Sequence, residues 1–172
     1  MNTPKTEFKY LLIFGAFWVV LILVSSHFLG IWDEQQRNPN QQLVSQTDNG
    51  VTEVELQASR QGHYLANGTI NSREVTFILD TGATLVAVSE EVAQQAGLPR
   101  GQRGRAQTAA GTVDVWSTTI DELRVGGIRF RNVSATINPG MDPNMVLLGM
   151  SVLSQVDFSQ RDGVLTLRQS PQ

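Results

Sequence analysis

One carboxylate in this chain stands between two apolar segments. Residues 75–79, Val-Thr-Phe-Ile-Leu, lead directly into Asp80, and a second apolar run, Leu-Val-Ala-Val, follows at 85–88. An ionised carboxylate avoids apolar surroundings unless it is hydrogen-bonded, paired or used in chemistry, because desolvation disfavours the charged form. A strand that ends on an acid between two buried segments therefore indicates a functional group.

The residues after this acid predict a sharp turn. Gly82 can take positive φ and lets other backbone groups come close, and Thr81 has a hydroxyl that could bond to a neighbouring segment. The sequence Asp80-Thr81-Gly82-Ala83, preceded by Phe-Ile-Leu, resembles the catalytic loop of aspartic proteases. It is most similar to the single-lobed, retropepsin-like branch (clan AA) found in retroviruses and many bacteria.

Two further segments extend the resemblance. Leu147-Leu148-Gly149 ends an apolar strand and is similar to the hydrophobic-hydrophobic-Gly signature that packs beside the catalytic loop in these enzymes. Between the two motifs, residues 106–121 predict a hairpin with a small-residue tip, where the family has a flap that folds over the substrate. The short strand 164–167 matches the terminal strands that often join two subunits in retropepsins.

The predicted fold of residues 51–172 is all-β with one or two short helices. The signals are alternating or apolar strands at 51–56, 63–70 and 75–79, and a hairpin at 123–130 that turns at Gly126 and Gly127. Ser89 can cap a short helix that Gly97 ends, and Glu90 and Glu91 suit its first turn. The resemblance implies a retropepsin-like acid-protease half-barrel with a single lobe.

The resemblance also implies an aspartic endopeptidase that hydrolyses polypeptide substrates. This chemistry needs two carboxylates, but the chain has one Asp-Thr-Gly, and its other aspartates lie in no comparable setting. The second acid is therefore expected to be Asp80 of another copy in a homodimer. The expected catalytic residues are Asp80, Thr81 and Gly82, and the expected substrate-binding residues are Ala83, Thr84, Ala110, Gly111 and Thr112.

Two residues of the loop bear on how far the family pattern applies. Ala83 matches the retroviral pattern but lacks the hydroxyl that pepsin-like enzymes often present to the aspartate. Thr84 stands where retroviral enzymes usually have a second aspartate that anchors the substrate backbone. The retroviral substrate contacts therefore do not transfer directly to this chain.

The N-terminal part predicts a membrane anchor. Residues 11–29 have no charge apart from His27, and nineteen helical residues span about 29 Å, close to the thickness of a bilayer core. With flanking Trp32, the expected transmembrane signal anchor covers residues 11–32, after a cytoplasmic segment at 1–10. Lysines before it and acids after it place the following domain outside the cytoplasm, in a periplasm if the cell is bacterial, attached to the inner membrane. A cleaved signal peptide is the alternative.

The polar segment 33–50 predicts a flexible tether between the anchor and the domain.

Composition excludes several classes of protein. The 172 residues include no cysteine, which excludes disulfides and thiol catalysis, and a net charge of −3 argues against nucleic-acid binding. With two histidines, no metal site or other cofactor is expected. The arginines at 100, 103 and 105 predict a solvated loop, with an acidic partner as the alternative.

Two other functions fit the same sequence. A domain of this fold could bind peptides or scaffold partners without hydrolysis, although the intact Asp80-Thr81-Gly82 favours the enzyme. A membrane adaptor is the third hypothesis, in which the β domain only mediates assembly. An apolar patch without a cleft beneath the hairpin would support it.

Overall fold

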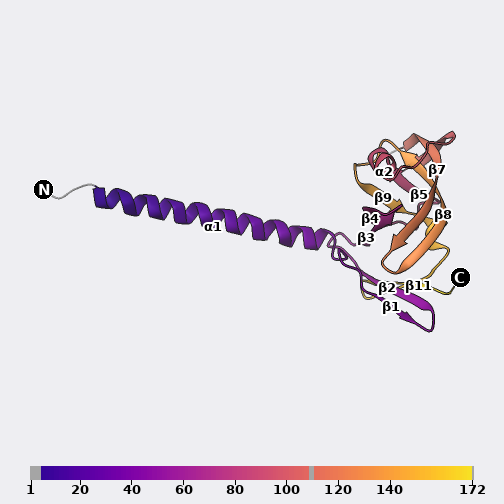
Figure 1. The fold of residues 1–172 in the computed structure, drawn as a ribbon, viewed down its shortest axis with the longest axis horizontal. Coiled ribbons are helices and arrows are strands. Elements are labelled where there is room, and N and C mark those ends of the chain that lie inside the picture. Colours follow the sequence, from indigo (N-terminus) through magenta and orange to yellow (C-terminus); the bar gives the residue numbers. More distant parts are fainter. Residues whose placement is uncertain (1–4, 109–110, 172) are drawn as a thin grey trace. The chain divides into compact units, whose positions relative to one another are not determined.

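The computed structural model describes residues 5–108 and 111–171, which form two units, Met1–Arg37 and Asn38–Gln172 (Figure 1). Helices and strands follow one another in the order α1 (Lys5–Arg37), β1 (Ser45–Asp48), β2 (Val51–Gln57), β3 (Leu65–Ile70), β4 (Arg73–Leu79), β5 (Val86–Ser89), α2 (Glu90–Gln95), β6 (Arg103–Thr108), β7 (Gly111–Val125), β8 (Ile128–Asn138), β9 (Met145–Leu148), α3 (Met150–Leu153), β10 (Asp157–Arg161) and β11 (Val164–Gln169).

The first unit is the single helix α1 of 33 residues, which contains the apolar run expected to form the anchor. Over the part of the chain that the structure describes, no helix is long and apolar enough to cross a membrane. The transmembrane anchor at residues 11–32 therefore stays a prediction.

The second unit is built around a seven-stranded sheet in the order β3-β4-β9-β5-β8-β7-β6. A pairing of β3 with β7, from Gly68 opposite Val125 to Ile70 opposite Leu123, closes six of these strands into a barrel. Most neighbours are antiparallel, but β9 runs parallel to β4 and β5 runs parallel to β8. The mostly β fold with two short helices in this unit agrees with the sequence prediction.

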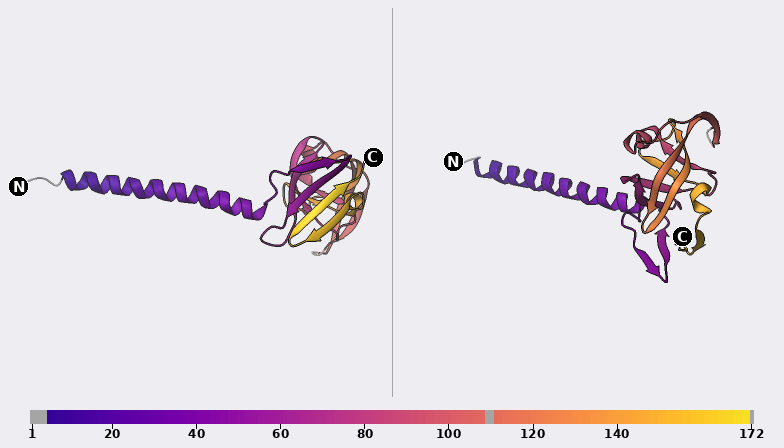
Figure 2. Two further views of the ribbon diagram at one scale, coloured as in Figure 1. Left: turned by 90° about the horizontal axis from the view of Figure 1, so that it is seen from below. Right: turned by 45° about the vertical axis from the view of Figure 1, so that its right-hand side comes forward.

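A smaller sheet of four strands has the order β1-β2-β11-β10, and its purple and yellow strands lie side by side in Figure 2. Alternation in β2 buries Val54 and Leu56, and β11 buries Leu165 and Leu167 on the same side. These residues join the core cluster formed by the large sheet, so the two sheets share one hydrophobic core.

Local chemistry explains where the short helix α2 begins and ends. The Ser89 Oγ accepts a hydrogen bond from Val92 N at 3.2 Å, as an N-cap does, and Glu90 and Glu91 occupy the first turn. The chain then passes through Gly97 at φ +67°, a conformation that favours glycine. The capped short helix was predicted, and its buried residues Val92 and Ala93 pack it against the core.

Residues 33–50 differ from the unstructured tether that their composition predicts. The helix continues to Arg37, β1 occupies Ser45–Asp48, and Asn38 and Asn40 are buried. The Asn40 side chain donates to the carbonyl oxygens of Gln57 (2.8 Å) and Leu65 (2.6 Å) and accepts from Gln57 N at 2.7 Å. This asparagine clamp joins β2 to β3, so the compact domain begins at Asn38, before the predicted boundary at 51.

Candidate active site

Asp80 follows the last residue of β4 and lies beside the end of β9. In the parallel pairing Leu79 stands opposite Leu148, and Asp80 N donates to Leu148 O at 3.1 Å. The Asp80 Oδ1 accepts a hydrogen bond from Gly82 N at 2.9 Å, and Ala83 N donates to the Asp80 carbonyl at 3.2 Å. These bonds form the tight turn that the sequence predicts and fix the carboxylate on it.

Gly149 allows the chain after β9 to touch this turn. A Cβ at residue 149 would lie 2.3 Å from the carbonyl oxygen of Leu85 and 2.7 Å from that of Ala83. The next two backbone N–H groups, of Met150 and Ser151, donate to the carbonyls of Ala83 (2.8 Å) and Thr84 (2.9 Å). The two predicted motifs are thus adjacent, and the second holds the first in place.

Ser151 supports the loop in a way that the sequence prediction missed. Its Oγ accepts from Val86 N at 3.1 Å and donates to Ser134 O at 3.2 Å. These contacts tie α3 to the strands on which the loop rests. A serine two residues after the Leu-Leu-Gly motif was the available signal, but its partners are distant in sequence.

The predicted catalytic loop is accessible to solvent. Asp80 and Ala83 are half-buried, whereas Thr81, Gly82 and Thr84 are exposed. Within the described residues, the Asp80 carboxylate has no ion-pair partner and the Thr81 hydroxyl has no hydrogen-bond partner. Both groups are therefore free to meet a substrate or another subunit.

The predicted flap is a hairpin of β6 and β7. The strands pair from Arg103 opposite Trp116 to Thr108 opposite Gly111, and Gly111 has φ +116°. The Thr108 Oγ1 donates to Gly111 O, and the Thr112 hydroxyl donates to Gln107 Oε1, both at 2.8 Å. Ala110, at the predicted tip, lies outside the described residues. The substrate-binding roles of this hairpin remain predictions.

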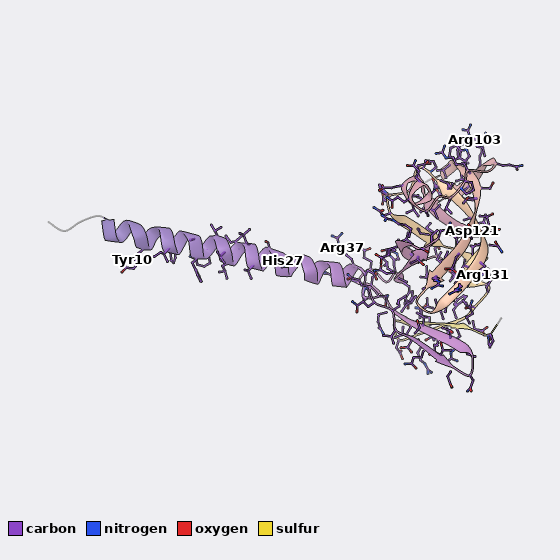
Figure 3. All side chains as sticks on the ribbon, viewed as in Figure 1. Tyr10, His27, Arg37, Arg103, Asp121 and Arg131 are labelled. Atoms are coloured by element: carbon purple, nitrogen blue, oxygen red, sulfur yellow. The ribbon has the colours of Figure 1, made fainter. Side chains whose placement is uncertain are left out.

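A cationic cluster surrounds the base of the hairpin, where Figure 3 labels Arg103. The guanidinium carbons of Arg100 and Arg103 lie 4.6 and 6.0 Å from the centre of the Trp116 ring. Arg100 also pairs with Glu90, and Arg103 pairs with Asp114 at 2.6 Å. Hydrogen bonds from Arg100 and then Gln94 hold the pKa of Glu90 below its ordinary value. Arg100, Arg103 and Arg105 are all exposed, as predicted, and the first two pair with acids of their own domain.

The groove of the domain lies apart from the Asp80 loop. A groove of about 870 Å³ is lined by β3, β4 and β7, with Glu74, Glu122 and Arg124 among its residues and none of residues 80–84. Within residues 5–108 and 111–171, no three His, Asp or Glu side chains are grouped so that they could hold a metal ion.

Comparisons with known proteins agree with this geometry. The sequence profile of the family described as "gag-polyprotein putative aspartyl protease" matches residues 66–155, from β3 to the end of α3. The matched range contains Asp80, the hairpin and Gly149. It therefore covers every part of the loop and its support.

Two bacterial relatives are similar in sequence. The "Uncharacterized protein in cobV 5'region" of Sinorhizobium sp is 30% identical over 166 residues, which are 89% of this chain and 71% of that protein. "Uncharacterized protein RP867" of Rickettsia prowazekii (strain Madrid E) is 30% identical over 107 residues, 61% of this chain and 46% of that protein. The chain thus spans less than half the length of the second relative.

A solved structure has the same fold. The crystal structure of a retropepsin-like aspartic protease from Rickettsia conorii superposes with a TM-score of 0.58 at 25% identity, over 74% of this chain and 94% of that one. The fold, the Asp80 loop held by Gly149 and the family match lead to one assignment. This chain belongs to the gag-polyprotein aspartyl protease family and is a single-lobed, retropepsin-like aspartic protease.

Proposed function

We propose that this chain is an aspartic endopeptidase whose active site contains two Asp80 carboxylates from two identical copies. The main support is the loop geometry, in which a solvent-accessible carboxylate is fixed by Gly82 N and braced by the segment after Gly149. Peptide binding alone would not require a carboxylate at this position. Membership of the aspartyl protease family supports the same activity.

The need for a second copy follows from the chemistry. Hydrolysis by this mechanism uses one ionised carboxylate as a base and one protonated carboxyl as an acid. None of the other aspartates of the domain lies in an Asp-Thr-Gly loop. Asp114 pairs with Arg103, and the rest are exposed: Asp48, Asp121, Asp142, Asp157 and Asp162. A two-fold axis beside Asp80 would place two identical carboxylates together.

The reaction then proceeds by general acid–base catalysis. Close like charges do not both ionise readily, so the two carboxyls hold one proton between them. The ionised member takes a proton from water as the water oxygen attacks the scissile carbonyl carbon, and the other donates its proton to the carbonyl oxygen. When the tetrahedral intermediate collapses, the carboxyl that accepted a proton gives it to the amine nitrogen and the C–N bond breaks. The other carboxylate takes a proton from one hydroxyl of the intermediate, so the product is a carboxylic acid and the pair again holds one proton.

The neighbouring residues have supporting roles in this proposal. Gly82 N fixes the Asp80 carboxylate and leaves space for the substrate, and the exposed Thr81 hydroxyl bonds across the two-fold axis. Ala83 and Thr84 line the path of the peptide. The hairpin around Gly111, with Ala110 and Thr112, closes over the bound peptide.

The proposed location is a membrane surface. The apolar N-terminal segment at 11–32 anchors the chain with its N-terminus in the cytoplasm, and the protease domain acts on the other side. Anchoring confines two copies to a plane and so favours their encounter. The test uses sealed inside-out vesicles, in which the cytoplasmic face of the inner membrane lies outside. Protection of the domain from added protease, with the N-terminus accessible, would support this topology, and the reverse pattern would contradict it.

Peptide hydrolysis by the full chain tests the activity. The wild-type protein and the Asp80→Asn variant are incubated with a peptide library across a pH series, and the products are identified by mass spectrometry. The exposed Asp121→Asn substitution serves as the matched control. We expect cleavage by the wild type and by Asp121→Asn, and none by Asp80→Asn. Equal cleavage by all three proteins would remove Asp80 from the mechanism.

A further inference from the structure

Strand β6 is an unpaired edge of the seven-stranded sheet. It pairs with β7 on one side, and no described strand pairs with it on the other. An open edge presents backbone N–H and C=O groups to which another extended segment can bind. Four residues of β6 are exposed and none is buried. The edge is therefore accessible to a second polypeptide.

A hydrogen bond just before β6 decides which of its backbone groups are free. Ser117 N donates to Gln102 O at 2.9 Å, so these two residues form a hydrogen-bonded pair. Hydrogen-bonded and non-hydrogen-bonded pairs alternate along an antiparallel ladder. In the register of β6 with β7, the non-hydrogen-bonded positions are then Arg103, Arg105 and Gln107. Their backbone groups point to the open edge.

The same positions place two arginines side by side. Residues at i and i+2 of a strand share a face, so Arg103 and Arg105 lie about 7 Å apart along one side of the hairpin. Arg103 pairs with Asp114 at 2.6 Å. Arg105 stands opposite Asp114 in the register, yet it has no ion-pair partner among residues 5–108 and 111–171. One guanidinium group is thus available to a ligand.

The chemistry of this edge favours an acidic partner. A hollow of about 610 Å³ on the hairpin is lined by two arginines and one acid, together with Gly104, Thr112 and Val113. Guanidinium groups bind carboxylates through short, charge-assisted hydrogen bonds. A second β6 strand would instead set arginine beside arginine, and like charges across two strands repel. The edge therefore suits an extended segment with acids at alternate positions.

We propose that β6 binds an extended acidic segment of the polypeptide substrate, whose carboxylates at positions i and i+2 pair with Arg103 and Arg105. This inference rests on the proposed function, because it names the substrate class of that same site. Arg105 lies three residues, about 10 Å along the strand, from Thr108 at the end of β6. The acidic segment therefore flanks the bond to be cleaved and does not contain it.

Three labelled peptides test the recognition. Each has nine residues with threonine flanks, and the central sequences are Glu-Thr-Glu, Glu-Glu-Thr and Gln-Thr-Gln. The first has both acids on one face of a strand, and the second has the same charge on opposite faces. Fluorescence anisotropy measures their binding to the full-length Asp80→Asn chain in detergent.

We expect Glu-Thr-Glu to bind at least about fivefold more tightly than either other peptide, and high salt to reduce the difference. Equal binding of the two acidic peptides would overturn the strand pairing. Equal binding of all three would overturn the recognition of acids.

Substitution of Arg105 tests the assigned residue. In the same Asp80→Asn chain, Arg105→Gln should bind Glu-Thr-Glu about fivefold more weakly, and Arg105→Glu should prefer a Lys-Thr-Lys peptide. Arg131→Gln is the matched control, since Arg131 is also exposed and lies away from Arg103 in Figure 3. Equal losses in Arg105→Gln and Arg131→Gln would mean that only net charge attracts the peptide. Circular dichroism shows whether each variant is folded.

The two proposals fail separately. Binding of Glu-Thr-Glu that requires Arg105, without cleavage of any peptide by the wild type, would refute the proposed function and retain the docking edge. Cleavage with the same KM for substrates with and without the acidic flank would refute the docking edge and retain the function. When both hold, Arg105→Gln raises KM for the acid-flanked substrate by about fivefold, whereas kcat, which depends on the Asp80 pair, changes less.

Discussion

Gly149 lies so close to the backbone of Leu85 that a Cβ on residue 149 would stand 2.3 Å from the Leu85 carbonyl oxygen. The obstructing atoms are backbone oxygens, so no side-chain rotation can relieve the contact. We expect Gly149→Ala to lower the free energy of unfolding by about 1–3 kcal/mol and to displace the Asp80 loop. Urea denaturation measures the loss. Gly104→Ala, where a Cβ would meet nothing within 4 Å, should change stability far less.

Subunit mixing tests whether both carboxylates are needed. If active sites form between two chains that exchange freely, one part of wild type mixed with nine parts of Asp80→Asn should lose about nine-tenths of its activity per wild-type chain. A nine-part excess of Asp121→Asn, which keeps Asp80, should cause no loss. The measurement is the initial rate on one peptide after equilibration. Retention of full activity in the first mixture would show that a single chain suffices.

We expect the asparagine clamp to contribute to the free energy of unfolding, although the segment around it has few apolar residues. Asn40 is 4% exposed and bonds to backbone groups of Gln57 and Leu65. Asn40→Ala leaves these groups without their partner, so we expect a loss of about 1–3 kcal/mol or more in urea denaturation. Gln46→Ala, on exposed β1, is the comparison and should stay near wild type. Similar stabilities for the two variants would mean that water replaces the clamp.

Acidification should loosen the contact between α2 and the flap base. The folded state holds the pKa of Glu90 below its ordinary value, mainly through Arg100, which also stacks on Trp116. The stabilisation that the ionised Glu90 carboxylate contributes is therefore fully present above its ordinary pKa. It is lost as the pH falls through the lower pKa that Glu90 has in the folded state. With Trp18 and Trp32 replaced by phenylalanine, Trp116 fluorescence should change over this range. The change should be absent in Glu90→Gln.

The Asp80 loop and the Gly149 segment that supports it could be predicted because each is a short contiguous motif. Asp80-Thr81-Gly82 and Leu147-Leu148-Gly149 each combine an apolar strand with a glycine, and the structure places them against one another. Their pairing in space follows from the family resemblance and not from periodicity. The brace by Ser151 was missed because its partners, Val86 and Ser134, are distant in the chain.

Other features could not be predicted from local composition. The segment around Asn38 and Asn40 has few apolar residues, and its order comes from hydrogen bonds to residues 17 to 29 positions away. Strand β10 was missed because Asp-Phe-Ser-Gln-Arg has one apolar residue and buries none of its positions. Such an edge strand is recognised only through its partner, in this case β11.

The place of β11 between β2 and β10 has a consequence for control of proteolysis. If activity requires two copies, as proposed, a lone copy whose terminal strand is already paired would be folded but inactive, and turnover would rise with the square of its concentration at low abundance. If the proposed anchor holds the chain in a bilayer, the density of the chain there would set the activity.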